Sequence, residues 1–574
     1  MKRGARINNK ALFLMILAVI AALHIAASAY YAPNIFQSEP GAGVFGGIRL
    51  HYLNPFNFDF SKGEAAAGGT SHILDNFIKS AVSGTHGMLD FLHWYLYIAV
   101  YSLLGIPLSE SWFIIAQAVV MAAALVMLAL LFARLYDSKP AALVFIFIAA
   151  QLFVNQSRSF YIIPANTLME GMLLWALYIY AKKGGSTLFG PALFLLLFIN
   201  AASGNIVKLP LYILFIWCVS YKYHGFGPIR FIKETIIKKP YNFIFAVPVI
   251  LALAGHFYVF SRLGQSHLGM FGWILQKFGV SGAASRFSML GEAFRKIFSF
   301  NAGDIWTAGL LFVFYVIAAA RSGRRAPLFF FPLVYYAYII NTEPNSAILP
   351  FSMILSLGVY GILLFAGSVT GQRAKTPGMV LSVILVSYIL ISFTSLTACE
   401  LGARQEPPPN YLKASGYFLR EHMKPEDKIA SLLAGTQNVL NEYYYGKNFF
   451  KSPVFGKYIY DLRNLTEPES ASNPVSDAER KADLAFYVVS RSSYSTDKEY
   501  ASFVDSSIKA RSLTKAADIA ADGVIYISVY SARPIKYEKV DIPQACAAFD
   551  RKYANIKMLF GNRHVGVAST WGYY

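Results

Sequence analysis

Long apolar runs set the fold class of this chain. A helix that crosses a bilayer needs about 20 mostly apolar residues, and the sequence offers about eleven such runs. Of the 574 residues, 56% are hydrophobic and only 14% are charged. The predicted spans are residues 11–30, 111–133, 141–155, 162–181, 186–200, 205–221, 241–261, 304–321, 327–341, 346–368 and 377–398. The chain is therefore expected to be a polytopic α-helical protein of the cell (inner) membrane.

Basic residues gather in the short loops between these runs, which explains the formal net charge of +19. The positive-inside rule places such loops on the cytoplasmic side. They are Lys182–Lys183, the run Lys222 to Lys239, Arg321 to Arg325, and Arg373 to Lys375. The first span, with its basic start, is expected to be a retained signal anchor that begins on the same side. This distribution of charge indicates membrane lipids as partners and no nucleic acid.

Residues 88–104 are also apolar, and the charge of the loops decides where they lie. If they crossed the membrane, the basic N-terminus would face away from the other basic loops. The segment is therefore predicted to lie along the outer surface as an amphipathic helix. The alternative is that it crosses and that one of the shorter runs is re-entrant.

The composition changes at Cys399, where charged and turn residues become frequent. We predict a transmembrane domain over residues 1–398, with a large first outer loop over 31–110, and an extracytoplasmic α/β domain over residues 399–574. In the second domain, helices are expected at 409–423 and 500–511, and strands at 429–433, 484–489 and 524–529. One disulfide between Cys399 and Cys546 is possible if this region is extracytoplasmic.

The first outer loop carries an acid with a candidate chemical role. Glu39 stands in Ser38-Glu39-Pro40-Gly41, a sequence typical of a turn, just after the first span. A carboxylate there could act as general base on an acceptor hydroxyl; the alternative is a solvated loop acid. His86 and His93 are seven residues apart, which is weak evidence for a metal. No metal site or cofactor is predicted, although a divalent ion is an option.

Three ionisable residues lie within or next to later spans. Glu170 is two turns into an apolar run, so it is either functional or paired with a neighbouring helix. Lys208 and Arg158 stand near outer boundaries, where they could bind a phosphate or simply extend toward the interface. Together with the basic residues of the outer loop 263–303, among them Arg286, they would form a site for an anionic lipid headgroup.

Several short motifs, in their order along the chain, resemble the GT-C superfamily of membrane glycosyltransferases. The similarity is to the group of protein O-mannosyltransferases, lipid A aminoarabinose transferases and bacterial lipopolysaccharide-core sugar transferases. It rests on Ser38-Glu39-Pro40-Gly41, Thr85 to Leu89, Tyr101 to Gly105, Ser157-Arg158, Asp427 to Ser431 and Tyr443 to Gly446.

The resemblance implies transfer of a sugar from a polyprenyl-phosphate donor to a glycan, lipid or protein acceptor at the outer face, with inversion. Glu39, or Asp59 in its place, would be the catalytic acid or base. The donor phosphate would bind Arg158, Lys208 and Arg286. The acceptor or sugar would contact His86, Asp90 and Glu170. The basic residues would stabilise the departing lipid phosphate.

The sequence departs from the family pattern at three places. Ser38 stands where the family usually has Asp, Gly87-Met88 replace two prolines, and Thr342 to Asn345 lacks an Arg-Tyr pair. Either Glu39 or Asp59 has taken over the catalytic role, or the protein is an inactive relative that binds lipid phosphate or assists envelope assembly. A transporter is less favoured, because the charged features gather at the outer face and not at the midplane.

Overall fold

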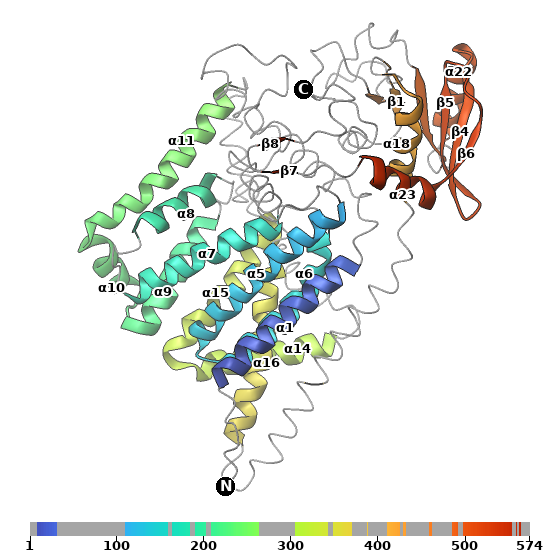
Figure 1. Ribbon diagram of the computed structural model, residues 1–574. Coiled ribbons are helices and arrows are strands. Elements are labelled where there is room, and N and C mark those ends of the chain that lie inside the picture. The colour runs from blue at the N-terminus through green and yellow to red at the C-terminus, as the bar shows by residue number, and fades with distance from the viewer. Residues whose placement is uncertain are drawn as a thin grey trace.

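The computed structural model describes residues 9–30, 110–158, 163–183, 190–202, 208–262, 305–342, 348–369, 387, 410–424, 427, 429–431, 459–461, 485–491, 498–553, 558–559 and 562–563. The part before residue 370 is a helical bundle (Figure 1). Its elements are α1 (Asn9–Tyr30), α5 (Glu110–Tyr136), α6 (Lys139–Arg158), α7 (Ile163–Lys182), α8 (Gly190–Ala202), α9 (Leu209–His224), α10 (Pro228–Ile232), η4 (Lys233–Ile237), η5 (Pro240–Ala246), α11 (Val247–Arg262), α14 (Ile305–Arg321), η6 (Gly323–Arg325), α15 (Ala326–Thr342) and α16 (Ile348–Val369).

Each predicted span before residue 370 overlaps a helix, whereas 377–398 lies outside the described residues apart from 387. Within the described ranges, three helices are long and apolar enough to cross a membrane, at Lys10–Ala29, Ile115–Tyr136 and Ile348–Phe365. The predicted number of spans is therefore not confirmed. Helix α8 shows why, because its 13 residues rise only about 20 Å, less than the roughly 30 Å of bilayer hydrocarbon.

Two contacts fix the direction of the first helix. The Lys139 Nζ lies 5.8 Å from the centroid of the Phe13 ring, and His24 Nδ1 lies 2.8 Å from the Ala150 carbonyl oxygen. Both contacts join residues of α1 and α6 at the same offset, so these helices run parallel. Helix α5 runs the opposite way, because a short turn at Asp137 connects it to α6. The end of α1 and the start of α5 therefore lie at the same end of the bundle.

The opposite end of the bundle is basic. The last turns of α5, α7, α9 and α14 carry Arg134, Lys182, Lys222 and Arg321. These turns meet, since Lys222 Nζ donates to the Arg134 carbonyl over 2.8 Å and Lys182 Nζ lies 5.3 Å from the Tyr223 ring centroid. The positive-inside rule predicts that this end faces the cytoplasm. On that orientation, the end of α1 and the start of α5 face outward. Residues 88–104 lie outside the described residues, and their surface placement stays a prediction.

The C-terminal part of the chain forms an α/β domain. Its elements are α18 (Tyr411–His422), β1 (Ile429–Ser431), β2 (Ile459–Asp461), β3 (Phe486–Ser490), α22 (Lys498–Ala510), β4 (Thr514–Ala521), β5 (Val524–Ser531), β6 (Glu538–Asp541), α23 (Ile542–Tyr553), β7 (Met558–Leu559) and β8 (Asn562–Arg563). The predicted α/β character of this region is confirmed, while the boundary at 399 lies outside the described residues and stays a prediction. In Figure 1 the sheet lies beyond the end of the bundle where α1 ends and α5 begins.

The sheet has six strands in the order β2-β1-β3-β5-β4-β6. Strands β1 and β3 are parallel, β3, β5 and β4 are successively antiparallel, and β6 is parallel to β4. The β4–β5 hairpin turns at Asp522 and Gly523, whose φ values of 49° and 80° suit the Asp-Gly pair of a type I′ turn. Strand β4 was not predicted, although the Asp-Gly pair that follows it is a hairpin-turn signal and indicates a strand before the turn.

Helices α18 and α23 pack on each other and on strands β4 and β6. Asn410 caps α18, accepting a hydrogen bond from the Lys413 backbone N–H over 3.0 Å. Cys546 of α23 is a thiol that is not part of a disulfide, and its Sγ donates to the Asn410 carbonyl at 3.3 Å. The suggested disulfide between Cys399 and Cys546 is therefore wrong in this structure, because the Cys546 thiol instead joins α23 to the start of α18.

A buried carboxylate links the central strands of the sheet. Asp518 of β4 is 3% exposed and accepts hydrogen bonds from Ser528 Oγ over 2.5 Å and from Tyr537 OH over 3.0 Å. Lys515 Nζ lies 2.6 Å from its Oδ2. Burial opposes ionisation, but the hydrogen bonds from Lys515, Ser528 and Tyr537 outweigh it and hold the pKa of Asp518 below its usual range.

We expect Asp518→Asn to destabilise this domain by about 1–3 kcal/mol at pH 7, the cost of losing charge-assisted hydrogen bonds. Because folding lowers the pKa of Asp518, its contribution is present above the unfolded-state pKa of about 3.9 and is lost as the pH falls through the folded-state pKa. The difference between the proteins should therefore shrink below about pH 4. Hydrogen exchange of β4–β5 peptides in the full chain measures this difference in stability between the wild type and Asp518→Asn. The control is Asp522→Asn in the exposed turn, and a pH-independent difference would contradict the prediction.

Candidate functional site

A buried ion pair lies in the half of the bundle away from the basic end. Lys208 Nζ is 3.0 Å from Glu170 Oε2, and the two side chains are only 2% and 6% exposed. The Tyr335 hydroxyl donates a hydrogen bond to the other carboxylate oxygen, Glu170 Oε1. Three helices that are distant in sequence thus meet at one carboxylate: α7 carries Glu170, Lys208 precedes α9, and α15 carries Tyr335.

The sequence around Lys208 fixes where its charge lies. Pro210 is in the first turn of α9, where its missing N–H costs nothing, and Lys208 is the residue that begins the helix. Glu170 lies seven residues into α7, about 10 Å along the helix axis from the start of α7. The long Lys208 side chain turns toward α7 and is buried there, so it does not extend to the interface. Its predicted role in phosphate binding stays a prediction.

The electrostatics of this pair depend on the helix ends. A cation at a helix N-terminus faces the positive end of the helix dipole, which is unfavourable. Burial adds a desolvation cost of several kcal/mol for each ion. The Glu170 carboxylate compensates both effects, and Tyr335 adds a hydrogen bond to the charged form. An anion that arrived near the start of α9 would meet the same two attractive features, the Lys208 ammonium and the helix N-terminus.

Further buried polar side chains occupy the same half of the bundle. Ser28 lies two residues before the end of α1, Gln117 is seven residues into α5, and Asn166 is three residues into α7. Ser28 and Gln117 are fully buried. Among the described residues, Ser28 Oγ, both amide atoms of Gln117 and Asn166 Oδ1 have no hydrogen-bond partner. Since unpaired polar groups are costly inside a membrane, this half of the bundle is suited to a polar occupant.

The structure brings together two of the residues predicted from the sequence, Glu170 and Lys208. The alternative expected for Glu170, pairing with a neighbouring helix, is the arrangement observed. Arg158 is the last residue of α6, and its side chain is outside the described part of the structure. The other predicted site residues also lie outside the described ranges: Glu39, Asp59, His86, Asp90 and Arg286. Their roles stay predictions.

Sequence reasoning missed Tyr335, Gln117 and Ser28. Tyr335 lies in the run Val334-Tyr335-Tyr336-Ala337-Tyr338, where nothing distinguishes the one tyrosine that reaches Glu170. Gln117 carried a usable signal, since an amide in an otherwise apolar run of α5 is rare. Within the described ranges, no group of three or more His, Cys, Asp or Glu side chains is placed to hold a metal ion.

A bundle of apolar helices with a buried ion pair in one half, and an α/β domain beyond that same end, defines a polytopic membrane protein with one specialised face. The solved structure of ArnT from Cupriavidus metallidurans in the apo state has a similar fold. The TM-score is 0.50 at 11% sequence identity, over 92% of this chain and 99% of that chain. At this sequence identity the likeness shows that the two chains share a fold. No protein-family model and no curated protein sequence matches the chain.

Proposed function

We propose that this protein is an integral membrane glycosyltransferase that takes a sugar from a polyprenyl-phosphate donor and transfers it at the outer face of the cell membrane. The acceptor is a glycan, a lipid or a protein of the cell envelope. The observation that carries the proposal is the buried Lys208–Glu170 pair at the start of α9, within a GT-C-like fold.

Lys208 is the group proposed to hold the donor phosphate. A lysine ammonium binds phosphate as a point charge, and the N-terminus of α9 favours an anion at the same place. In a site that excludes water, this attraction is much stronger than on a surface. Because the lipid phosphate gains negative charge as it leaves the sugar, such a cation stabilises the transition state more than the ground state.

Glu170 is proposed to keep the site neutral before the donor binds. Without the carboxylate, Lys208 would be an uncompensated buried cation, which is strongly destabilising. When the donor phosphate approaches, the ammonium shares its hydrogen bonds between phosphate and carboxylate. Tyr335 holds the carboxylate in place during this exchange, since its hydroxyl donates to Oε1 while Lys208 binds Oε2.

The remaining roles follow the resemblance to GT-C enzymes. The acceptor hydroxyl oxygen attacks the anomeric carbon, the bond from that carbon to the phosphate oxygen breaks, and the lipid phosphate leaves with the electron pair. Glu39 or Asp59 takes the hydroxyl proton. Arg158 and Arg286 add to the phosphate site, and His86 and Asp90 contact the acceptor or the sugar.

The test is transfer by the purified full-length protein in nanodiscs, supplied with a panel of polyprenyl-phosphate sugars and an envelope lipid extract. We expect product with at least one donor, and Lys208→Arg, which keeps the charge, should retain more activity than Lys208→Met. Lys238→Met is the matched control, because Lys238 also pairs with a glutamate, Glu234, over 2.8 Å but on the surface. If Lys208→Met and Lys238→Met lost product to the same extent, the activity would not depend specifically on the buried pair.

For the catalytic acid, we expect Glu39→Gln to slow transfer by about 10²–10⁴-fold, the usual contribution of a general base. Donor binding should change little, since the carboxylate acts on the acceptor. Glu234→Gln, which removes a partly exposed acid, is the control. A folded Glu39→Gln protein that transfers sugar at the wild-type rate would reassign the role to Asp59, to be tested as Asp59→Asn.

A second candidate function is favoured by Ser38, which replaces the aspartate usual in the family. In that case the protein binds lipid phosphate through Lys208 and assists envelope assembly without transferring sugar. The same nanodisc experiment separates the two functions, because the second gives donor binding that depends on Lys208 and no product with any donor.

A further inference from the structure

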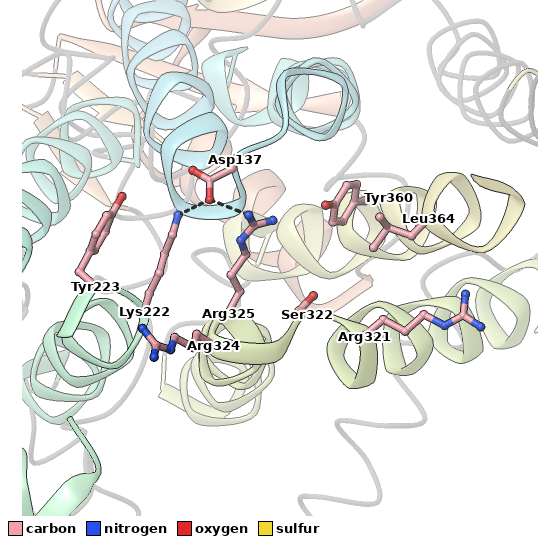
Figure 2. Close-up of a pocket in the computed structure, with 9 residues that line it drawn as sticks. All are labelled: Asp137, Lys222, Tyr223, Arg321, Ser322, Arg324, Arg325, Tyr360 and Leu364. Atoms are coloured by element: carbon pink, nitrogen blue, oxygen red, sulfur yellow. Dashed lines mark ion pairs between the residues drawn. The ribbon is translucent and has the colours of Figure 1, made fainter. Parts of the chain in front are cut away.

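A second site lies at the basic end of the bundle, away from the Glu170–Lys208 pair. A cavity of about 530 Å³ opens there between four segments of the chain. Its lining residues are Asp137, Lys222, Tyr223, Arg321, Ser322, Arg324, Arg325, Tyr360 and Leu364 (Figure 2). The volume is within the range of small-molecule sites, roughly 300–1,000 Å³. The lining carries four cationic side chains and a single carboxylate.

Two of the four cations have a structural role. Lys222 Nζ and Arg325 Nη2 both bind Asp137 Oδ2, at 2.9 and 3.0 Å, and Figure 2 shows the carboxylate between them. Lys222 also donates to the carbonyls of Arg134 and Leu135, the last turn of α5, both over 2.8 Å. These contacts satisfy carbonyl groups at the C-terminus of α5, where the helix dipole is negative, and they hold both cations in fixed positions.

The other two cations lie at the exposed edge of the cavity. Arg321 and Arg324 are exposed, and Arg321 lies over the Phe365 ring at 5.8 Å. Among the described residues, no carboxylate other than Asp137 lines the cavity. Asp137 is shared by Lys222 and Arg325, so the cavity keeps an excess of positive charge. A guanidinium group can bind a phosphate through two parallel hydrogen bonds. Basic groups that gather around a cavity therefore indicate a bound anion, which charges scattered over a flat surface would not.

The wall formed by α14 and α16 indicates that the anion carries a lipid chain. Tyr360 and Leu364 are four residues apart on α16, so they share one face of that helix. Val313 and Val316 of α14 are 54% and 50% exposed, so this helix carries apolar surface on the outside of the bundle. An acyl chain could follow this surface while its headgroup entered the basic cavity.

We propose that this cavity binds the phosphate group of an anionic lipid headgroup at the basic end of the bundle. Lys222 and Arg325, fixed by Asp137, form its floor, and Arg321 and Arg324 form its rim. Basic pockets between membrane helices on the cytoplasmic side are suited to such headgroups. The proposal does not depend on glycosyl transfer, because the site lies at the opposite end of the bundle from Lys208.

The test is binding of phosphatidylglycerol, with phosphatidylcholine as the zwitterionic reference, to the full-length protein in a non-ionic detergent, followed by native mass spectrometry. We expect Arg321→Gln/Arg324→Gln to weaken phosphatidylglycerol binding by about 10- to 30-fold, from the usual contribution of two basic side chains near an anionic headgroup. Phosphatidylcholine binding should be weak and unchanged. Arg321→Lys/Arg324→Lys, which keeps the charge, should restore most of the affinity.

The matched control is Arg230→Gln/Lys233→Gln. It removes two exposed charges, one in α10 and one at the start of η4, and Arg230 also lies over an aromatic ring, that of Phe226, at 5.2 Å. An equal loss of affinity in the control would overturn the proposal in favour of diffuse surface charge. A separate arm adds inorganic phosphate without lipid. If phosphate alone stabilises the wild type but not the Arg321→Gln/Arg324→Gln protein against heat, the phosphate site is supported, and its ligand can be a soluble phosphate. If neither lipid nor phosphate distinguishes the two proteins, the proposal fails.

Discussion

Lys208→Met should destabilise the protein by about 3–5 kcal/mol, the usual cost of leaving one partner of a buried ion pair uncompensated. Methionine is unbranched and only one atom shorter than lysine, so the change removes the charge with little loss of packing. Glu170 is 6% exposed and would keep only the hydrogen bond from Tyr335 among the contacts described above. Thermal unfolding of the purified protein in one detergent, with and without the substitution, measures the effect.

Two further variants separate charge from packing. Lys238→Met removes a lysine whose pairing distance to Glu234, 2.8 Å, is close to that of the buried pair but whose side chain is 55% exposed. It should change stability by less than about 1 kcal/mol. Lys208→Met/Glu170→Gln removes both charges, and replacing a buried pair is often nearly neutral, so it should recover much of the loss. A double variant as unstable as Lys208→Met alone would show that the charge of Glu170 is not the cause.

The helical part of the fold could be predicted because apolar runs in a membrane protein have few alternatives. The predicted run 162–181 and helix α7 differ by one residue at each end. The number of helices long enough to span a membrane was harder to predict, since short helices such as α8 carry the same apolar composition as long ones. In the C-terminal domain, β3 and β5 were predicted from apolar runs. Strand β4, whose Ala516 and Ala517 have weak strand propensity, was not.

The candidate site could be predicted only in part. Glu170 and Lys208 were identified one at a time, because an ionisable residue within an apolar run stands out from its neighbours. Their pairing depends on how α7 and α9 pack, and the sequence carries no signal for a contact across 38 positions. Tyr335 is a common residue in an aromatic-rich helix, so only the packing of α15 reveals it. The basic loops were predicted to share a side of the membrane, but their convergence on one cavity was not.

The two ends of the bundle handle charge in different ways. The Glu170–Lys208 pair is neutral as it stands, so an anion that bound Lys208 would have to compete with an existing carboxylate, which favours specific binding over simple attraction. The basic end keeps an excess of positive charge and is open to solvent and lipid, because Arg321 and Arg324 are exposed. The first arrangement suits an exchange of partners during a reaction, and the second suits a resident anion that fixes the position of the bundle in the membrane.

The second large effect is expected at the contact between α14 and α16. Gly361→Ala would place a methyl group against the carbonyl oxygen of Phe314, and Gly358→Ala would place one 2.6 Å from that of Leu311. Backbone cannot move aside as a flexible side chain can, so the two helices must separate. We expect a loss of at least 1–3 kcal/mol, the usual cost of overpacking. Glycines that allow close approach of membrane helices commonly occupy such positions.

Two other glycines supply graded controls. At Gly171 the added methyl would meet the flexible end of Met127 at 2.5 Å, and at Gly190 it would meet nothing within 4 Å. Thermal unfolding should therefore rank Gly361→Ala as most damaging, Gly171→Ala as intermediate, and Gly190→Ala as neutral or slightly stabilising through helix propensity. Because Tyr360 and Leu364 adjoin Gly361 on α16, Gly361→Ala should also weaken phosphatidylglycerol binding at the basic cavity. An unchanged melting temperature for Gly361→Ala would show that α14 and α16 are not in backbone contact.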